Sequence, residues 1–338
     1  MAEDLLINHK RFKTAHKITA TKYQKYNSFF NDYAKRKYTL IDNDCLCGAK
    51  NDQLISHFDR YSVEFQTVIC KDCGLVRASK YFNKENVNDF YKNHYRNIMN
   101  HGAGYLNPRD FFERQKLESS GKYELIKKES NMKLEGLKVL DLGGGAGGAL
   151  DSFKNLNEVY LADFFEPYLK LARIKGIKVI KGGLKEISFK ADIVIICHVL
   201  EHWNDFENEI ERLISIQKKN KTINYIEFPG IDSLKHGRRD GDFFNDIHIP
   251  HVYYFTSYVF ENLMNRYGFE KVYIDSEIRA IFIYTGIKKG LKNYYNQVKD
   301  DLIKAESKRK KLAIRKIVKA FIPNKVLALR QNIIKNYF

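Results

Sequence analysis

The order of apolar and amphipathic segments between residues 136 and 287 predicts an α/β fold with a parallel sheet. Short apolar segments alternate there with helical segments, which is the pattern of βαβ units. A run of glycines directly follows the first expected strand, and an aspartate ends the second. Ligands of open α/β sheets bind at the carboxyl ends of the strands. We therefore expect the ligand site at this glycine turn.

Each element of the expected sheet follows from local sequence. The strands are expected over residues 138–142, 159–163, 178–181, 192–197 and 222–227, followed by an antiparallel pair over 270–274 and 280–284. The connecting helices are expected over residues 146–154, 167–175, 206–217 and 258–267. Gly268 closes the last of these helices, because glycine is favoured just beyond a helix end.

The composition fits a folded protein with additions to one α/β domain. Of the 338 residues 44% are hydrophobic, with 23 Phe and 22 Tyr, so a sizeable core can form and global disorder is excluded. No apolar run approaches the roughly 20 residues of a membrane-spanning helix. The amino terminus lacks the basic start and apolar stretch of a secretory signal, so a cytoplasmic location is expected.

Five segments are expected along the chain. They are an N-terminal arm (1–40), a cysteine-bearing module (41–85), a helical connector (86–135), the α/β domain (136–287) and a basic helical tail (288–338). The connector is expected to form apolar helical stripes from Phe90, Tyr91, Tyr95, Phe111, Phe112 and Leu117.

The net charge of +17 is concentrated in the tail. Residues 288–338 contain 15 Lys or Arg and three acids. The preceding 287 residues therefore have a net charge of only +5. Apolar residues there follow a helical spacing at Ile314, Ile317, Val318, Phe321 and Ile322. Such a basic amphipathic helix can lie on an anionic inner-membrane surface as a peripheral anchor. The alternative is a helix that packs on its own domain or dimerises.

The glycines of the turn do not choose between cofactors by themselves. Gly143, Gly145 and Gly148 satisfy the dinucleotide pattern G-x-G-x-x-G. Asp141 discriminates, because a carboxylate repels a pyrophosphate but attracts the ammonium and sulfonium groups of S-adenosylmethionine (SAM). Asp163, at the end of the next strand, can accept hydrogen bonds from ribose hydroxyls in either cofactor.

The turn, Asp163 and two later segments (191–202 and 250–257) together resemble the class I SAM-dependent methyltransferases over about residues 110–285. The resemblance implies a Rossmann-like sheet of that class. It also implies that the methionine part of SAM binds at Asp141, Gly143, Gly144 and Gly145, the ribose at Asp163, the adenine at Phe164, Gly183 and Leu184, and the sulfonium end at His198 and Val199.

Four of the five cysteines form two pairs, Cys45 with Cys47 and Cys70 with Cys73. Thiolate pairs beside turn glycines can converge tetrahedrally on Zn²⁺. The segment resembles the zinc module that precedes some bacterial sugar methyltransferase domains. With four ligands no position stays open, so the expected zinc is structural. The alternatives are free thiols or a metal-free remnant, and His57 offers a substitute ligand.

Histidines after two expected strand ends are candidates for a catalytic base. Methyl transfer is an in-line displacement, and an alcohol acceptor benefits from a general base. His202 and His251 are the favoured candidates, with His198 and His248 beside them. The alternative is that these residues only orient loops. Loop 230–249, with Arg238, Arg239 and Asp246, is expected to form a lid or a substrate loop for a polar or phosphate-bearing acceptor.

These observations favour a SAM-dependent methyltransferase that O-methylates a sugar or sugar-linked group in bacterial surface polysaccharide, with a glycan as acceptor. One alternative is an RNA methyltransferase. The low net charge of the first 287 residues argues against a nucleic-acid partner, because nucleic-acid-binding domains are usually strongly basic. The other alternative is a non-catalytic SAM-binding scaffold, which predicts damage to the glycine turn or to Asp163. Neither is damaged in this sequence.

Overall fold

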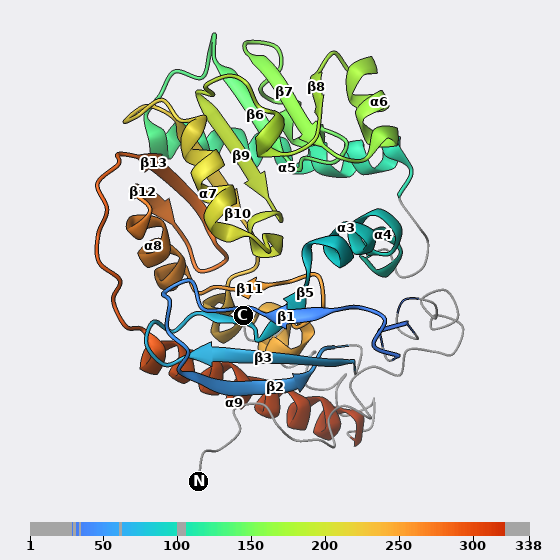
Figure 1. Cartoon of the computed structure of the whole chain (residues 1–338), viewed down its shortest axis with the longest axis vertical. Helices are drawn as coiled ribbons and strands as arrows, with labels where there is room; N and C mark the ends of the chain where they lie inside the picture. Colours follow the sequence, from blue (N-terminus) through green and yellow to red (C-terminus); the bar gives the residue numbers. More distant parts are fainter. Residues whose placement is uncertain (1–28, 30–31, 34, 61–62, 100–105, 322–338) are drawn as a thin grey trace, which may run out of the picture.

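The computed structural model describes residues 29, 32–33, 35–60, 63–99 and 106–321, with side chains as far as Arg315. Most of the expected N-terminal arm and the tail beyond Phe321 therefore lie outside the described residues. A seven-stranded sheet and a smaller cysteine-bearing sheet lie one above the other in Figure 1. Helices α3 (Lys84–Asn93) and α4 (Tyr95–Met99) lie beside the junction, and helix α9 (Tyr295–Phe321) runs along the lower edge.

The seven-stranded sheet confirms the predicted α/β class. Its strands are β6 (Lys138–Leu142), β7 (Glu158–Asp163), β8 (Lys178–Lys181), β9 (Ile193–Cys197), β10 (Ile223–Glu227), β12 (Phe269–Ile274) and β13 (Arg279–Tyr284). Their spatial order is β12-β13-β10-β9-β6-β7-β8. Neighbours from β10 to β8 are parallel, and β13 is antiparallel to both β10 and β12, as the expected final pair requires.

Alternate side chains of the central strand divide the core between two helical layers. Val194 and Ile196 of β9 join a cluster with helices α7 (Phe206–Ser215) and α8 (Ser257–Arg266). Ile193 and Ile195 join the opposite cluster, which includes helices α5 (Pro108–Ser130) and α6 (Glu166–Ile174). Because both faces are buried, the strand is a continuous apolar run rather than an alternating one.

The prediction of a helix over residues 146–154 is wrong. Only a short 3-10 turn, η1 (Gly148–Leu150), follows the glycines, because α5 occupies the position of a longer helix. A Cβ at Gly148 would lie 2.2 Å from the carbonyl oxygen of Phe112. The Ser119 hydroxyl donates to the carbonyl of Ala149 and accepts from the amide of Ser152, so it binds groups that a helix would use.

The predicted apolar stripes of the helical connector are present, except at Leu117. Phe90 and Phe112 are fully buried, but Leu117 is 82% exposed. The buried face of α5 follows Phe112, Ser119, Lys122 and Ile126, which have helical spacing. Leu117 lies off this face, because the helix packs on the glycine turn through small and polar side chains.

The second sheet has the order β11-β4-β3-β2 and combines distant parts of the chain. Strands β2 (Asp52–Phe58), β3 (Glu64–Cys70) and β4 (Val76–Ala78) come from the cysteine segment, whereas β11 (Tyr253–Tyr254) follows the last candidate histidine. Two further strands, β1 (Leu40–Asp42) and β5 (Lys80–Phe82), pair with each other. Through β11, the cysteine segment is joined to the segment of chain that follows β10 of the larger sheet.

The first part of the basic tail packs on the protein itself. Val298, Leu302 and Ala305 of α9 are buried, and Asp301 forms an ion pair with Lys235 at 3.0 Å. Ile314 is 60% exposed, and the apolar positions that follow it are not described as side chains. Within the described residues, no helix combines the length and apolar character that crossing a membrane requires.

Candidate active site and cysteine cluster

The glycine turn brings the backbone into two close approaches at the end of β6. Gly143 has φ of 66°, and a Cβ there would lie 2.5 Å from the Val199 side chain. A Cβ at Gly144 would lie 2.0 Å from Oδ2 of Asp141. The turn therefore bends back over Asp141 on one side and meets the loop after β9 on the other, and only glycine fits at these positions.

Asp141 is a buried carboxylate with an unsatisfied oxygen. Its side chain lies beneath the turn with 1% of the residue exposed, and Oδ2 has no hydrogen-bond partner among the described residues. Burial raises the pKa of Asp141 to about 7; the charge of Lys122 opposes this rise and that of Asp163 adds to it. An unpaired buried acceptor is costly, and a cationic donor such as the SAM ammonium would relieve that cost. The residue therefore fits the methionine end of SAM.

Asp163 holds the turn from the end of β7. Its Oδ2 accepts the amide of Gly145 at 3.0 Å, and its Oδ1 accepts the amide of Phe165 at 2.8 Å. The guanidinium of Arg96, from α4, lies 3.6 Å from Oδ1 and 4.1 Å from the centre of the Phe165 ring. Burial raises the pKa of Asp163, although the Phe165 amide and Arg96 oppose the rise. Each oxygen keeps a lone pair for a ribose hydroxyl.

The predicted adenine residues separate into exposed and buried ones. Phe164 is 75% exposed and lies beside Gly183, where a Cβ would be 3.5 Å from its ring. Leu184 is only 3% exposed and belongs to the core. An exposed aromatic ring next to Asp163 is available for stacking on a ligand base. Adenine binding by Phe164, Gly183 and Leu184 stays a prediction.

Gln115 on α5 contacts the turn without any signal in the sequence. Its Nε2 donates to the carbonyl of Gly144 at 2.9 Å, while its Oε1 accepts the amides of Ala146 at 3.2 Å and Gly148 at 3.4 Å. One side-chain amide thus satisfies a backbone carbonyl and two backbone amides of the turn. No motif links a glutamine to a turn that lies 28 residues or more further along the chain.

The loop after β9 places His198 beside the turn. His198 adopts φ of 56°, its side chain is 58% exposed, and its Nδ1 lies 3.5 Å from Oε1 of Glu201. The following residue, Val199, is the one that contacts the Gly143 position. Desolvation lowers the pKa of His198, but the nearby carboxylate of Glu201 raises it more, so the net shift is upward.

Glu201 is surrounded by three histidines. The residue is 2% exposed, and neither carboxylate oxygen has a hydrogen bond among the described residues. Besides Nδ1 of His198, the nearest nitrogens to Oε1 are Nε2 of His202 at 3.7 Å and Nε2 of His251 at 3.9 Å. Burial lowers the pKa values of His202 and His251, so both rings are neutral at neutral pH. The structure therefore brings together the histidines that the sequence places after two different strands.

In the expected substrate loop, residues 230–249, charged side chains form ion pairs with one another. Both nitrogens of the Arg238 fork pair with Asp246, and Nε of Arg239 lies 2.7 Å from the same carboxylate. Phe243 and Phe244 are buried. The loop is built from three 3-10 turns, η4 (Ile231–His236), η5 (Arg238–Gly241) and η6 (Phe243–Asn245), that pack against α9. Arg238 is therefore a structural ion-pair partner rather than a free phosphate ligand.

The four predicted cysteines converge on one point. Sγ of Cys45 lies 3.4 Å from that of Cys47 and 3.5 Å from that of Cys73, and Sγ of Cys47 lies 3.6 Å from that of Cys70. A tetrahedral ion with bonds of about 2.3 Å needs sulfur separations of about 3.8 Å. Gly48 and Gly74 follow the pairs with positive φ. The cluster fits a metal ion, and His57 is not part of it.

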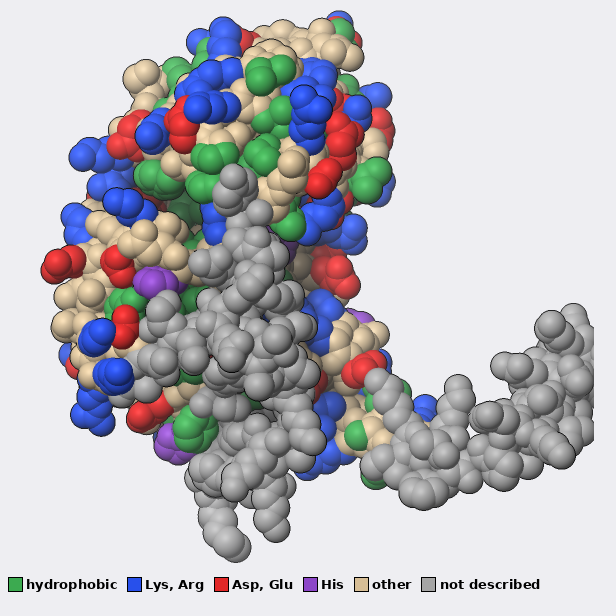
Figure 2. All heavy atoms as spheres, turned by 90° about the vertical axis from the view of Figure 1, so that its right-hand side faces the viewer, with side chains coloured by type: hydrophobic (Ala, Val, Ile, Leu, Met, Phe, Trp, Pro, Cys, Tyr) green, Lys and Arg blue, Asp and Glu red, His purple; other side chains and the backbone are tan. Residues whose placement is uncertain are grey.

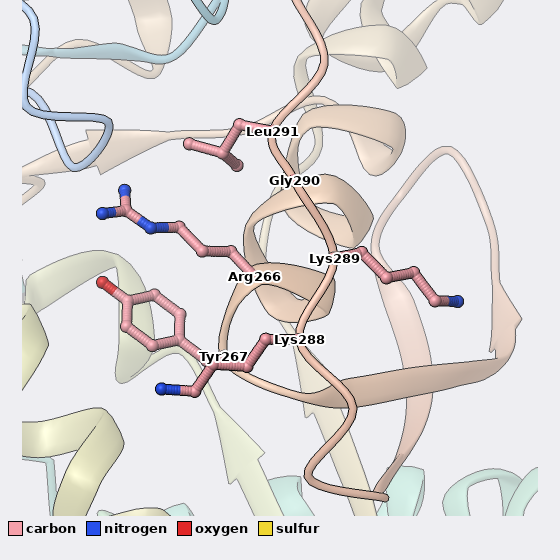
Figure 3. Close-up of a pocket in the computed structure, with 6 residues that line it drawn as sticks. All are labelled: Arg266, Tyr267, Lys288, Lys289, Gly290 and Leu291. Atoms are coloured by element: carbon pink, nitrogen blue, oxygen red, sulfur yellow. The ribbon is translucent and has the colours of Figure 1, made fainter.

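A separate pocket of about 550 Å³ lies at the end of α8, away from the glycine turn. It is lined by Arg266, Tyr267, Lys288, Lys289, Gly290 and Leu291. In Figure 3 the side chain of Lys289 points away from those of Arg266 and Lys288, and Arg266 donates to the carbonyl of Leu46. The three cationic side chains do not converge on a common ligand.

Comparisons with known proteins place the chain in a family. The model of the family described as "Methyltransferase domain" matches residues 91–274, just over half of the chain. Comparison with curated proteins gives no match.

Solved structures give distant similarities. Magnesium protoporphyrin IX methyltransferase from Synechocystis PCC 6803, solved with bound S-adenosylhomocysteine, is 19% identical, with 59% of this chain and 98% of that chain covered and a TM-score of 0.40. The 1,6-didemethyltoxoflavin-N1-methyltransferase of Burkholderia thailandensis is 13% identical, with coverages of 59% and 85% and a TM-score of 0.37. The family match and the parallel sheet with its single reversed strand agree with the glycine turn and its two aspartates. The chain belongs to the methyltransferase domain family and is a class I SAM-dependent methyltransferase.

Proposed function

We propose that the protein transfers the methyl group of SAM to a hydroxyl of a sugar or sugar-linked group in bacterial surface polysaccharide. One observation carries the proposal: the Glu201–histidine group begins at His198, directly before the valine that contacts the cofactor turn. A proton acceptor therefore lies within one residue of the predicted sulfonium end. An alcohol needs such an acceptor, because its proton must leave as the carbon–oxygen bond forms.

His198 is the histidine best placed to take that proton. Its side chain is 58% exposed, whereas those of His202 and His251 are about a tenth exposed. Glu201 faces its Nδ1 and favours the tautomer with a proton there, which leaves Nε2 as the base. When bound, SAM supplies a methyl group on a cationic sulfur. Nε2 of His198 would accept the hydroxyl proton as the acceptor oxygen took the methyl group and the neutral thioether was released.

His202 and His251 then have a supporting role in this proposal. Both rings lie against the buried carboxylate and are closed off from solvent. This choice differs from the sequence-based preference for His202 or His251 as the base, which rested on position after a strand and not on exposure.

The sugar acceptor is supported by the cysteine segment rather than by the site. The residues Cys45, Cys47, Cys70 and Cys73 resemble the zinc module of bacterial sugar methyltransferases. We propose that a structural zinc ion joins them. The second pair is held against the start of the tail, because Tyr294 donates its amide to the carbonyl of Cys73 at 3.3 Å. Zinc would thus fix α9 as well as the sheet.

The tail is proposed to dock on an anionic membrane surface through its last part only. One face of the segment 298–305, with Val298, Leu302 and Ala305, is buried against the protein and is not available to a membrane. Exposed Ile314 lies beyond that segment. Docking through this part of the tail would place the enzyme beside lipid-linked glycans. Binding of the full chain to anionic vesicles, together with loss of binding in a chain ending at Ile314, would support membrane docking.

The acceptor assignment is tested with purified protein, labelled SAM and a panel of free, nucleotide-linked and lipid-linked sugars. We expect an O-methylated sugar, and His198→Asn should lower kcat by about 10²–10⁴-fold while SAM affinity stays unchanged. His57→Asn is the matched control, since His57 lies on β2 outside the site. Methylation of RNA but of no sugar, or full activity of His198→Asn, would contradict the proposal.

A further inference from the structure

We propose that Glu201, His202 and His251 bind a divalent transition-metal ion, a second metal site distinct from the cysteine cluster. The role of such an ion in catalysis rests on the proposed function, but its binding does not. The three residues offer one carboxylate oxygen and two imidazole nitrogens, and these atoms lie within 4.8 Å of one another. Two imidazoles and a carboxylate are a ligand set that Zn²⁺, Fe²⁺ and Mn²⁺ accept.

Distances within the group are close to those of an occupied site. Oε1 of Glu201 lies 3.7 Å from Nε2 of His202 and 3.9 Å from Nε2 of His251. A tetrahedral ion with bonds of about 2.1 Å separates its ligands by about 3.4 Å. Each imidazole nitrogen must approach the Glu201 oxygen by only about 0.3–0.5 Å. The two imidazole nitrogens, which lie within 4.8 Å of each other, must approach by at most about 1.4 Å, which side-chain torsions can supply.

The protonation of His202 is fixed in the form that a metal requires. Its Nδ1 lies 2.7 Å from the carbonyl oxygen of Pro250, and because a carbonyl only accepts, Nδ1 carries the proton. The lone pair therefore resides on Nε2, which faces Glu201. Metal-binding histidines usually have this second hydrogen bond, which sets their tautomer and ring orientation.

Three other acids with little or no solvent exposure each have a Lys or Arg partner, whereas Glu201 has none among the described residues. Asp246 is paired with Arg238, Asp301 with Lys235, and Glu227 with Lys122. In the described part of the chain, Glu201 has ion-pair contacts only with histidines. An ionised carboxylate buried without a permanent cation is strongly disfavoured. A bound divalent ion would provide the missing charge.

The site would leave a position open, in contrast to the cysteine cluster. Three protein ligands allow a fourth from solvent or substrate, the arrangement of catalytic rather than structural sites. The exposed His198 contacts the same carboxylate and leads from the group to the cofactor turn. An acceptor hydroxyl bound to the ion would lose its proton more easily, and His198 would accept it.

Cobalt distinguishes the two sites in the intact protein. We would express the full chain in medium supplemented with Co²⁺, measure metal content and record absorption spectra. Cobalt in the cysteine cluster gives thiolate-to-metal charge transfer, whereas cobalt bound by imidazole and carboxylate gives only weak d–d bands. We expect about two cobalt ions per chain, one for each proposed site.

Isosteric variants separate the predicted outcomes. Glu201→Gln should remove one equivalent of cobalt and the weak bands, leaving the charge-transfer bands unchanged, and Cys70→Ser should do the reverse. His248→Gln is the matched control, because the His248 ring contacts that of His251 but is not one of the three ligands. Circular dichroism and SAM binding show whether each variant is folded.

The result that overturns the inference is a wild-type cobalt content and spectrum that Glu201→Gln leaves unaltered. If Glu201, His202 and His251 bind no metal but the protein still methylates a sugar, the proposed function remains supported. Conversely, cobalt lost in Glu201→Gln from a protein that methylates no sugar would support the metal site and refute the proposed function.

Discussion

A buried carboxylate lies at each end of the active site, but the two have different surroundings. At the cofactor end, Asp141 lies beneath a glycine turn with one oxygen unpaired. At the acceptor end, Glu201 lies among three histidines. The first residue is separated from the glycines by a single position in the sequence, whereas the second gains a partner from a loop 50 residues further on. In the proposed mechanism, cofactor binding therefore depends on a local segment, whereas proton transfer from the acceptor depends on the tertiary fold.

The largest effect is expected from removing the second aspartate of the cofactor end. Asp163→Ala loses the acceptor for the Gly145 amide and the predicted acceptor for two ribose hydroxyls. Hydrogen bonds to a charged group contribute about 1.5–3 kcal/mol each, so SAM affinity should fall by roughly 100-fold or more. Calorimetric titration with SAM measures this change. Affinity equal to that of the native protein would remove Asp163 from the cofactor site.

A methyl group on the turn should have a similar but smaller effect. Gly144→Ala places its Cβ 2.0 Å from the Asp141 carboxylate, so the turn must shift and SAM affinity should fall by at least about tenfold. Gly121→Ala is the matched control, because Gly121 lies in α5 with nothing within 4 Å of the added carbon. That substitution should leave affinity unchanged. Equal affinities of the two variants would show that the turn does not contact SAM.

The acceptor end should be separable from the cofactor end. Glu201→Gln keeps the shape of a side chain that makes no hydrogen bond among the described residues, but removes its charge. We expect turnover to fall by at least about tenfold, since the base loses its orienting partner, while SAM affinity changes by less than about twofold. Parallel measurement of kcat and of the SAM dissociation constant tests this. A large loss of SAM affinity would mean that the two ends are coupled.

The last expected effect is on stability and its dependence on pH, away from SAM binding and turnover. Burial raises the pKa of Asp141 to about 7 from an ordinary value of 3.8. Between these values the folded SAM-free protein binds a proton that the unfolded chain does not bind, so the free energy of unfolding should decrease as pH rises through this window. In Asp141→Asn that contribution is absent. Thermal unfolding at several pH values should show the variant gaining stability relative to the native protein as pH rises towards 8.

The sequence predicts best what neighbouring residues determine. Asp141 and the turn are adjacent, and Asp163 follows because β7 pairs with β6 in parallel register. The histidines were placed near each other because both of their segments follow strands of one sheet. In these cases a short-range pattern and one rule of sheet topology are sufficient.

Residues held by packing could not be predicted in this way. Gln115 and Arg96 reach the cofactor site from helices without a motif, and strand β11 joins a sheet whose other strands lie far earlier in the chain. The helix expected at 146–154 did not form because α5 satisfies the same backbone groups. The exposed Leu117 has the same origin, since α5 uses a polar face against the turn.

The dependence of SAM affinity on pH tests the assignment of Asp141 most directly. If the ionised carboxylate binds the SAM ammonium, affinity should increase as pH rises through about 7, and binding near that pH should release a proton. Asp141→Asn should bind weakly and without this dependence. Titrations in buffers of different ionisation enthalpy measure both quantities. SAM binding that is tight, independent of pH and unchanged in Asp141→Asn would contradict the account.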